Sequence, residues 1–138
     1  MRKWSLLALA VVLAGALGGY FGFGRTADVQ AQDCDDWVQE TNDRVNDART
    51  LLYPADRPDA FQGSADEAAR EMDAILAEQE ESEPPDGGGN LNGDLIEAML
   101  NGFEALSGGG SDPAVQITFA KSILYNADAR LVALNDSC

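Results

Sequence analysis

The chain has 138 residues, of which 24 are acidic and nine basic, with no histidine and two cysteines. This length suffices for one domain. The lack of histidine excludes Ser-His-Asp and Cys-His catalysis and histidine-based zinc sites, and two cysteines cannot build a four-thiolate zinc site. We therefore expect a protein that is not an enzyme and that needs no cofactor. The acidic charge also argues against nucleic acid as a partner, because phosphates are repelled.

The N-terminal residues form a hydrophobic segment of the kind that directs export. Arg2 and Lys3 precede residues 4–24, which carry no charge. A basic start followed by an apolar run keeps the N-terminus in the cytoplasm and sends the remaining chain across a membrane. Two interpretations stay open. Either the segment is a signal peptide that is cleaved after Ala31, or it is a permanent anchor, since its residues at 1.5 Å each span about 31 Å, close to a bilayer core.

Residues 1–31 are therefore assigned to targeting and residues 32–138 to an acidic extracytoplasmic domain. Three breaks rich in glycine and proline, residues 53–63, 83–90 and 107–112, divide this domain into four segments. No segment has the alternating β-branched pattern of a strand. Each instead repeats apolar residues at helical spacing, so the sequence predicts four amphipathic helices.

The first two helices are predicted from their apolar faces and from signals at their ends. Pro54 ends the first helix, because a residue that precedes proline avoids helical backbone angles. Ser64 and Glu67 form a capping box at the start of the second helix. The expected buried residues are Trp37, Thr41, Val45, Ala48 and Leu52 in the first helix, and Ala65, Ala68, Met72, Ile75 and Leu76 in the second.

The third helix has the weakest signal and the fourth the strongest. Gly93 and Gly102 each disfavour a helix by about 1 kcal/mol relative to alanine, although Gly102 would also allow close contact with a neighbour. Ser111 or Asp112 caps the fourth helix, with Pro113 at its first position. The expected buried residues are Leu91, Leu95, Met99, Phe103 and Leu106 in the third helix, and Ile117, Ala120, Leu124, Ala127, Leu131 and Leu134 in the fourth, with Phe119 and Ile123 widening that stripe.

Four such helices joined by short breaks predict an all-α fold, an antiparallel up-down four-helix bundle that follows the N-terminal export or anchor helix. In this topology the start of the first helix and the end of the fourth lie at the same end of the bundle. Cys34 and Cys138, the two cysteines, occupy those positions. Since export supplies an oxidising compartment, we predict a disulfide between them within one chain.

Residues 86–97 partly match a calcium-binding loop. Oxygen-bearing side chains stand at five of the ligand positions of such a loop, and they are Asp86, Asn90, Asn92, Asp94 and Glu97. Against the match, Gly88 has no side-chain oxygen at the third position, and Leu91 stands where such a loop needs glycine. We therefore predict a flexible linker here and keep the five residues only as weak metal candidates.

The sequence favours a non-enzymatic module that acts by interaction or as a structural element at the cell envelope. The membrane is a partner through residues 4–24 if that segment stays uncleaved. Four glutamates cluster near the end of the second helix, where they form either a solvated helix end or a docking surface for a basic protein; they are Glu78, Glu80, Glu81 and Glu83. The alternative function is a helical bundle that binds a small ligand or a cation such as calcium.

Overall fold

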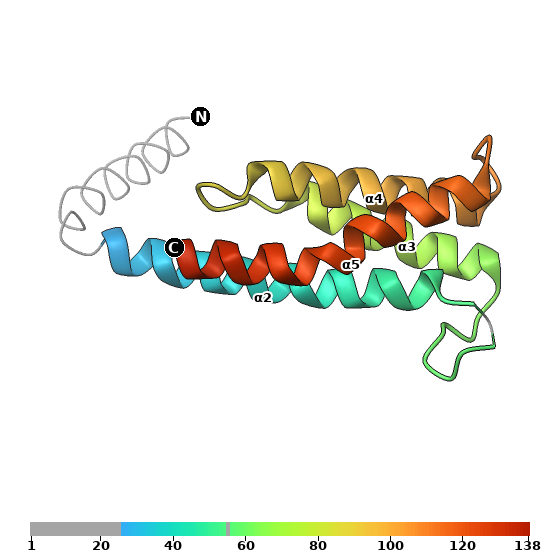
Figure 1. The fold of residues 1–138 in the computed structure, drawn as a ribbon, viewed down its shortest axis with the longest axis horizontal. Coiled ribbons are helices and arrows are strands. Elements are labelled where there is room, and N and C mark those ends of the chain that lie inside the picture. The colour runs from blue at the N-terminus through green and yellow to red at the C-terminus, as the bar shows by residue number, and fades with distance from the viewer. Residues whose placement is uncertain (1–25, 55) are drawn as a thin grey trace, which may run out of the picture. The chain divides into compact units, whose positions relative to one another are not determined.

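The computed structural model describes residues 26–54 and 56–138, with side chains from Asp33 onward. The chain separates into two units, Met1–Gln32 and Asp33–Cys138. The described residues form four helices and no strand (Figure 1). The helices are α2 (Thr26–Leu52), α3 (Ala65–Glu81), α4 (Gly89–Ser107) and α5 (Pro113–Ser137). The predicted all-α class and the four helices are therefore confirmed for this part of the chain.

The predicted export or anchor segment, residues 4–24, lies outside the described residues. Within the described ranges, no helix is long and apolar enough to cross a membrane. Helix α2 begins at Thr26. The predicted cleavage point after Ala31 therefore falls inside this helix rather than in a loop that precedes it.

The helix ends follow the capping chemistry of the sequence. The Ser64 side chain accepts a hydrogen bond from the backbone N–H of Glu67 at 3.2 Å and starts α3. The Asp112 carboxylate accepts one from the backbone N–H of Val115 at 3.3 Å and starts α5. Helix α4 begins at Gly89 without a side-chain cap and ends at Ser107, directly before Gly108, whose φ of 77° only glycine adopts freely. Both predicted N-caps are thus confirmed.

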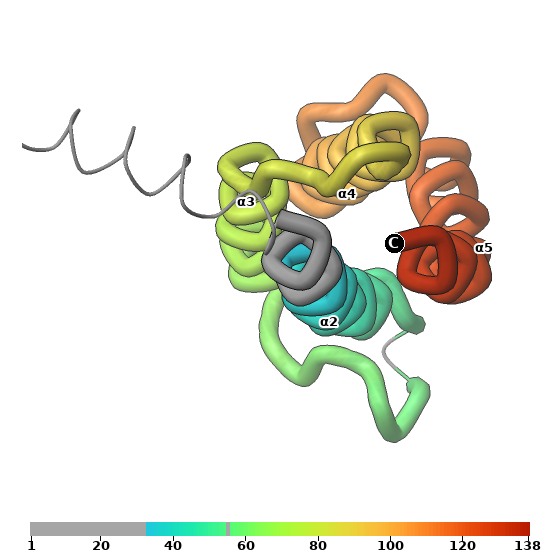
Figure 2. The backbone as a smooth tube through the Cα atoms, turned by 90° about the vertical axis from the view of Figure 1, so that its left-hand side faces the viewer, coloured from blue at the N-terminus to red at the C-terminus, as the bar shows by residue number. Residues whose placement is uncertain are grey.

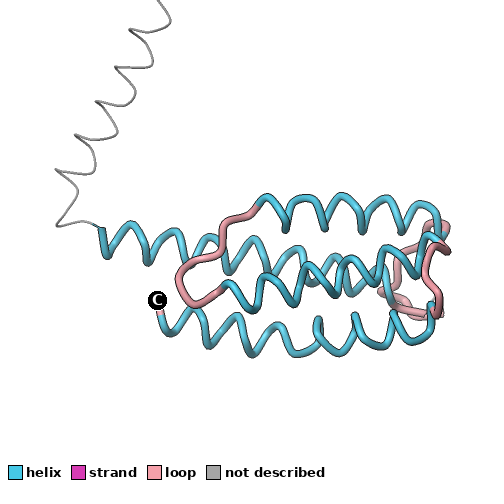
Figure 3. Tube along the Cα trace, turned by 90° about the horizontal axis from the view of Figure 1, so that it is seen from above, coloured by secondary structure: helices cyan, strands magenta, loops and turns pink. Residues whose placement is uncertain are grey.

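The four helices pack around one core and form a helical bundle. Figure 2 looks along the bundle and shows α2 between α3 and α5. Helix α3 packs against α4, and α4 packs against α5. Side chains of α2 close the arrangement, since Arg44 bonds to α3 and Arg49 bonds to α5. The connecting loops gather at the ends of the helices (Figure 3).

The predicted apolar faces form this core with two exceptions. The buried cluster contains residues from all four helices, including Val45, Met72, Leu95 and Leu124. Ala65 is exposed because it is the first residue of α3. Phe119 was expected to widen the buried stripe of α5, but it remains 36 % exposed. It precedes the buried Ala120 by one residue and therefore projects about 100° away from the core direction.

Gly102 allows α4 to approach its neighbours, as the sequence suggested. A Cβ atom at this position would lie 3.1 Å from Met72 Cε and 3.5 Å from Leu52 Cδ2. Gly102 is itself buried. A side chain here would occupy space that α2 and α3 already fill, so the helical cost of this glycine is offset by closer packing.

Candidate functional site

The five weak metal candidates do not form a loop. Helix α4 begins at Gly89, so only the first three residues of the segment 86–97 precede it, and Asn90, Asn92, Asp94 and Glu97 lie within helical backbone. Two of the four point their oxygens at protein groups. Asn92 Oδ1 accepts a hydrogen bond from Gln79 Nε2 at 2.6 Å, and Asp94 Oδ2 accepts one from Arg130 Nη1 at 2.7 Å. No three acidic or cysteine side chains within the described part of the chain converge as a metal site.

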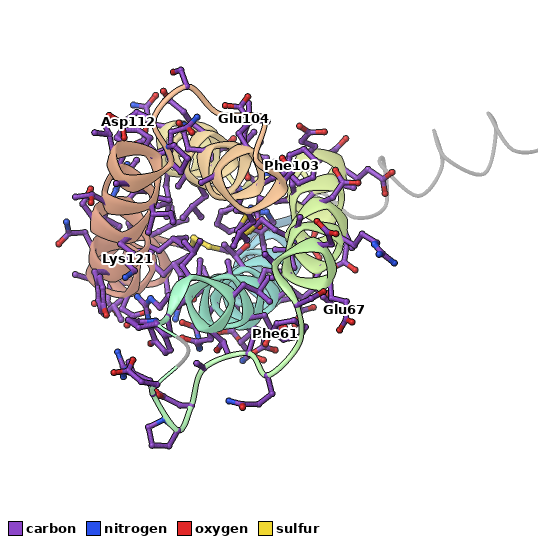
Figure 4. All side chains as sticks on the ribbon, turned by 90° about the vertical axis from the view of Figure 1, so that its right-hand side faces the viewer. Phe61, Glu67, Phe103, Glu104, Asp112 and Lys121 are labelled. Carbon is purple, nitrogen blue, oxygen red and sulfur yellow. A yellow bond between two sulfur atoms is a disulfide. The ribbon has the colours of Figure 1, made fainter. Side chains whose placement is uncertain are left out.

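The two cysteines meet, as the sequence predicts. The sequence places Cys34 at the start of the first helix, but α2 begins earlier, at Thr26, so Cys34 lies within it and is buried. Cys138 directly follows α5. Their Cα atoms are 6.4 Å apart, inside the range of about 4.4 to 6.8 Å that disulfides require. Their sulfur atoms lie at bonding distance, drawn as the yellow bond in Figure 4. The pair joins residues separated by 104 positions and so closes nearly the whole domain.

A buried polar network, which the sequence did not reveal, links α2, α3 and α4. Arg44 exposes only 8 % of its surface and Gln79 none. Arg44 Nη1 donates to Gln79 Oε1 at 3.1 Å and to the Glu78 backbone carbonyl at 3.2 Å. Its Nε donates to the Glu40 carbonyl at 3.2 Å. The amide nitrogen of Gln79 continues the chain to Asn92.

The buried polar atoms of Arg44 and Gln79 have partners, which is what permits their burial. Trp37 Nε1 donates to Ser82 Oγ at 3.3 Å, and that hydroxyl donates to the Gln79 carbonyl at 2.8 Å. The Arg44 charge is balanced at the bundle surface by Glu40 Oε2, 3.4 Å away. These bonds join α2, α3 and α4 to one another.

One sequence signal could have indicated the network. Gln79 continues the buried series of Met72, Ile75 and Leu76 at helical spacing, so a polar residue occupies a core position. The position of Arg44, directly before the buried Val45, does not by itself indicate that Arg44 is buried. Its partners belong to another helix, and a single-helix pattern cannot identify them.

A polar groove lies between α2, α3 and the loop that connects them. Its volume is about 390 Å³. Phe61 of the connecting loop forms part of one wall (Figure 4). Three carboxylates line the groove together with Arg44, and they are those of Asp47, Glu71 and Glu78. Apolar side chains, among them Leu51 and Ile75, make up much of the remaining lining.

Helix α5 carries a second regular face, opposite its buried one. The exposed residues of this face are spaced 3-4-3-4-3, and they are Val115, Thr118, Ser122, Tyr125, Ala129 and Val132. We call this set the outer face of α5. It carries no charged side chain, and Val115 and Val132 each remain 61 % exposed. Val115, Thr118 and Ser122 also line a shallow depression of about 420 Å³.

Helix α5 differs in net charge from helices α2 and α3. Helix α5 has two basic residues, Lys121 and Arg130, and two acidic residues, Asp128 and Asp136, so it is neutral. In contrast, residues 33–52 of α2 and all of α3 together contain 13 acidic and three basic residues. The glutamates near the end of α3 extend this acidic side. The bundle thus has one strongly acidic side and one neutral, partly apolar side.

Comparison with known proteins found no matching family model, no matching curated protein and no matching solved structure. The functional argument therefore rests on the residues and their geometry alone.

Proposed function

We propose that the protein is an exported or membrane-anchored extracytoplasmic helical module that acts by interaction at the cell envelope, without catalysis. The observation that carries this proposal is the Cys34–Cys138 pair. Thiols at bonding distance form a lasting disulfide in an oxidising compartment and stay reduced in a cytosol. The apolar residues 4–24 supply a route to such a compartment. The cysteine pair and the apolar N-terminal segment each support an extracytoplasmic location.

We include in the proposal an antiparallel up-down order of the four helices. In an antiparallel pair, contacts that advance along one helix retreat along the other. Paired contacts between neighbouring helices have this property, which supports the proposed order. They are Cys34–Cys138 and Arg49–Leu124 for α2 and α5, Trp37–Ser82 and Arg44–Gln79 for α2 and α3, Gln79–Asn92 and Met72–Gly102 for α3 and α4, and Asp94–Arg130 and Glu104–Gln116 for α4 and α5.

Interaction is favoured over catalysis by what the bundle presents to solvent. The buried network around Arg44 is satisfied internally. The outer face of α5, by contrast, exposes valine, tyrosine and small residues without charge along most of one helix. Regular apolar surface of this kind is a feature of sites where proteins meet.

The test of the proposal is localisation. A reporter fused after Cys138 and expressed in the host should be found outside the cytoplasm, and the N-terminal residue of the purified protein should be Gln32 for a cleaved signal peptide or Met1 for an anchor. A matched control removes Arg2, Lys3 and the apolar residues that follow, which should retain the reporter in the cytoplasm. A full-length fusion that is wholly cytoplasmic would refute the proposal.

The second candidate function is binding of a small ligand or a cation, favoured by the groove that contains Asp47, Glu71 and Glu78. We expect calcium to show no saturable site at micromolar concentration in a calorimetric titration. The Glu97→Gln variant tests the loop candidate, and Glu71→Gln tests the groove. A one-to-one site that either change removes would favour this second function over the first.

A further inference from the structure

We propose that the outer face of α5 pairs antiparallel with the same face of a second copy of this chain. The inference rests on the proposed function as an interaction module and names its partner. It is drawn from three observations on α5: its charge, its residue spacing and the positions of the two charged side chains beside the outer face.

The first observation is that only α5 offers a neutral helix in an acidic domain. From Gln32 onward the chain has 23 acidic and six basic residues, a net charge of −17. Two copies that met through α2 or α3 would bring acidic surfaces together, which opposes association. Contact through α5 keeps these surfaces apart, at distances where salt screens much of their repulsion. The neutral helix is therefore the place where two such domains can meet.

The second observation is the heptad spacing of the outer face. The interval from Val115 to Val132 follows the alternating three- and four-residue spacing through which helices pack in coiled coils. The buried face of α5 follows the same spacing and already packs against the bundle. A helix with two such faces is suited to partners on both sides. Small residues between the bulky ones, Ser122 and Ala129, allow a partner helix to approach closely.

The third observation sets the orientation. Lys121 and Asp128 lie seven residues apart, on the same flank of the outer face, in equivalent positions of successive heptads (Figure 4 labels Lys121). In an antiparallel pair, equivalent flanks of the two helices face each other. A two-fold axis beside the middle of α5 then brings Lys121 of each copy near Asp128 of the other.

Among the described residues Lys121 has no ion-pair partner, and Asp128 is paired on one oxygen but remains partly exposed. Lys121 takes part in none of the four ion pairs found among the described residues. Asp128 Oδ2 accepts from Arg49 Nη1 at 3.1 Å, and the Asp128 side chain remains 56 % exposed. In a parallel pair, Lys121 would instead face the opposite flank, which holds the uncharged Phe119 and Asn126. Charge therefore favours the antiparallel arrangement.

The size of the outer face predicts a weak, reversible dimer. From Val115 to Val132 the helix is about 26 Å long. One pair of helices of this length buries less than the roughly 1,200 Å² at the lower end of stable protein interfaces. We therefore expect dissociation in the micromolar range or above, so that local concentration at the envelope decides how much dimer forms.

The experiment is sedimentation equilibrium of the protein as recovered from its host, from about 10 µM to about 1 mM. Val132→Asp should weaken dimerisation on the order of tenfold or more, because it places a buried charge in the interface. The matched control is Leu100→Asp, which puts the same charge on an exposed apolar residue of α4 and should leave dimerisation unchanged. Far-UV circular dichroism checks that both variants keep their helices.

A charge reversal tests the orientation. Lys121→Asp alone and Asp128→Lys alone should each weaken self-association, because like charges then face each other across the two-fold axis. Mixing the two variants should restore association, since each supplies the charge that the other lacks. Restoration supports the antiparallel pair. Variants that fail to recover when mixed, in a protein whose wild type dimerises, overturn the orientation.

Other outcomes separate this inference from the proposed function. A wild-type protein that is monomeric at all these concentrations, or a dimer that Val132→Asp leaves intact, overturns the pairing. If that protein is exported and its cysteines are bonded, the proposed function still stands. A chain that is cytoplasmic, with free thiols, would remove the proposed function and the inference together.

Discussion

Helices α3 and α5 both bury one apolar stripe but present different surfaces to solvent. The outer side of α3 carries seven acidic residues and one basic residue. Helix α5 as a whole has two acidic and two basic residues, and none of them belongs to its outer face. A single buried stripe is enough to hold a helix in a bundle. The charged outer side of α3 therefore needs only contact with water. The outer face of α5 is more apolar than folding of the bundle requires.

The two helices also contact α2 in different ways. In α3, the Gln79 side-chain amide oxygen and the Glu78 backbone carbonyl accept hydrogen bonds from the buried Arg44. In α5, the Leu124 carbonyl and the Asp128 carboxylate accept hydrogen bonds from Arg49 near the surface. The cysteine pair joins the C-terminal end of α5 to α2 a second time. Specific buried polar contacts thus position one side of the bundle, and a covalent closure secures the other.

The largest effect is expected from reducing the Cys34–Cys138 bond. Loop closure over about 100 residues contributes roughly 4 to 5 kcal/mol in the chain-entropy model. Reduction should lower the thermal midpoint of the protein while the helical far-UV signal persists below the transition, because the apolar faces remain. Cys34→Ser with Cys138→Ser is the matched variant and should melt at the same temperature with and without reductant. An unchanged midpoint on reducing the wild type would show that α5 does not need the closure.

The two faces of α5 can be compared directly by truncation. Leu124→Ala should destabilise the fold by about 3 kcal/mol, because Leu124 is fully buried and its loss leaves a cavity. Val132→Ala, on the outer face, should change the unfolding free energy of the monomer by less than about 0.5 kcal/mol. Chemical denaturation at low protein concentration measures both. A comparable loss in the second variant would mean that the outer face belongs to the folding core.

The polar side of the bundle responds differently to the loss of a partner. Gln79→Leu should destabilise the protein by about 2 kcal/mol, since Arg44 loses one of its acceptors and the half-buried Asn92 Oδ1 loses its donor. Combining it with Arg44→Met should recover part of this loss, because the buried side chain at position 44 then needs no acceptor. The measurement is a double-mutant cycle by urea denaturation. Additive effects in the two variants would show that the two side chains do not interact.

The smallest effect concerns the acidic end of α3. Glu81 is the last residue of that helix, where a negative charge opposes the helix dipole. Glu81→Gln should raise stability by about 0.5 kcal/mol at low salt and by less at high salt. On the neutral helix, Asp128→Asn removes the Arg49 ion pair and should lower stability instead. Thermal midpoints with opposite signs in the two variants would support the contrast between α3 and α5.

The sequence predicts much of the fold because helical spacing, capping and helix breakers are local signals. Ser64, Asp112 and Pro113 mark helix starts, and the buried stripes follow from periodicity within each segment. The meeting of Cys34 and Cys138 also follows from the sequence, since an even number of antiparallel helices returns the chain to its first end. These inferences need no knowledge of which side chain faces which.

The sequence does not predict the buried network or the start of α2 at Thr26, ahead of Cys34. Arg44, Gln79 and Asn92 come from three helices, and their pairing depends on the helices' relative rotation. The glycine-rich segment before Leu91 predicts a flexible linker with only weak metal candidates, and helix α4 starts two residues earlier than expected, at Gly89, where it directs Asn92 and Asp94 to protein partners. The residues of the outer face of α5 also follow the 3-4 spacing in the sequence. They were not singled out, because the buried stripe alone was enough to predict the helix.

The most direct test of the account is the thiol state of the protein taken from its host without reductant. We expect no free thiol, and a tryptic digest analysed by mass spectrometry should contain residues 131–138 joined through Cys138 to the peptide that ends at Arg44 and contains Cys34. This result would establish a chain closed within one copy in an oxidising compartment. Two free thiols, or a bond between Cys34 and Cys138 of different copies, would contradict the closed bundle and its proposed extracytoplasmic location.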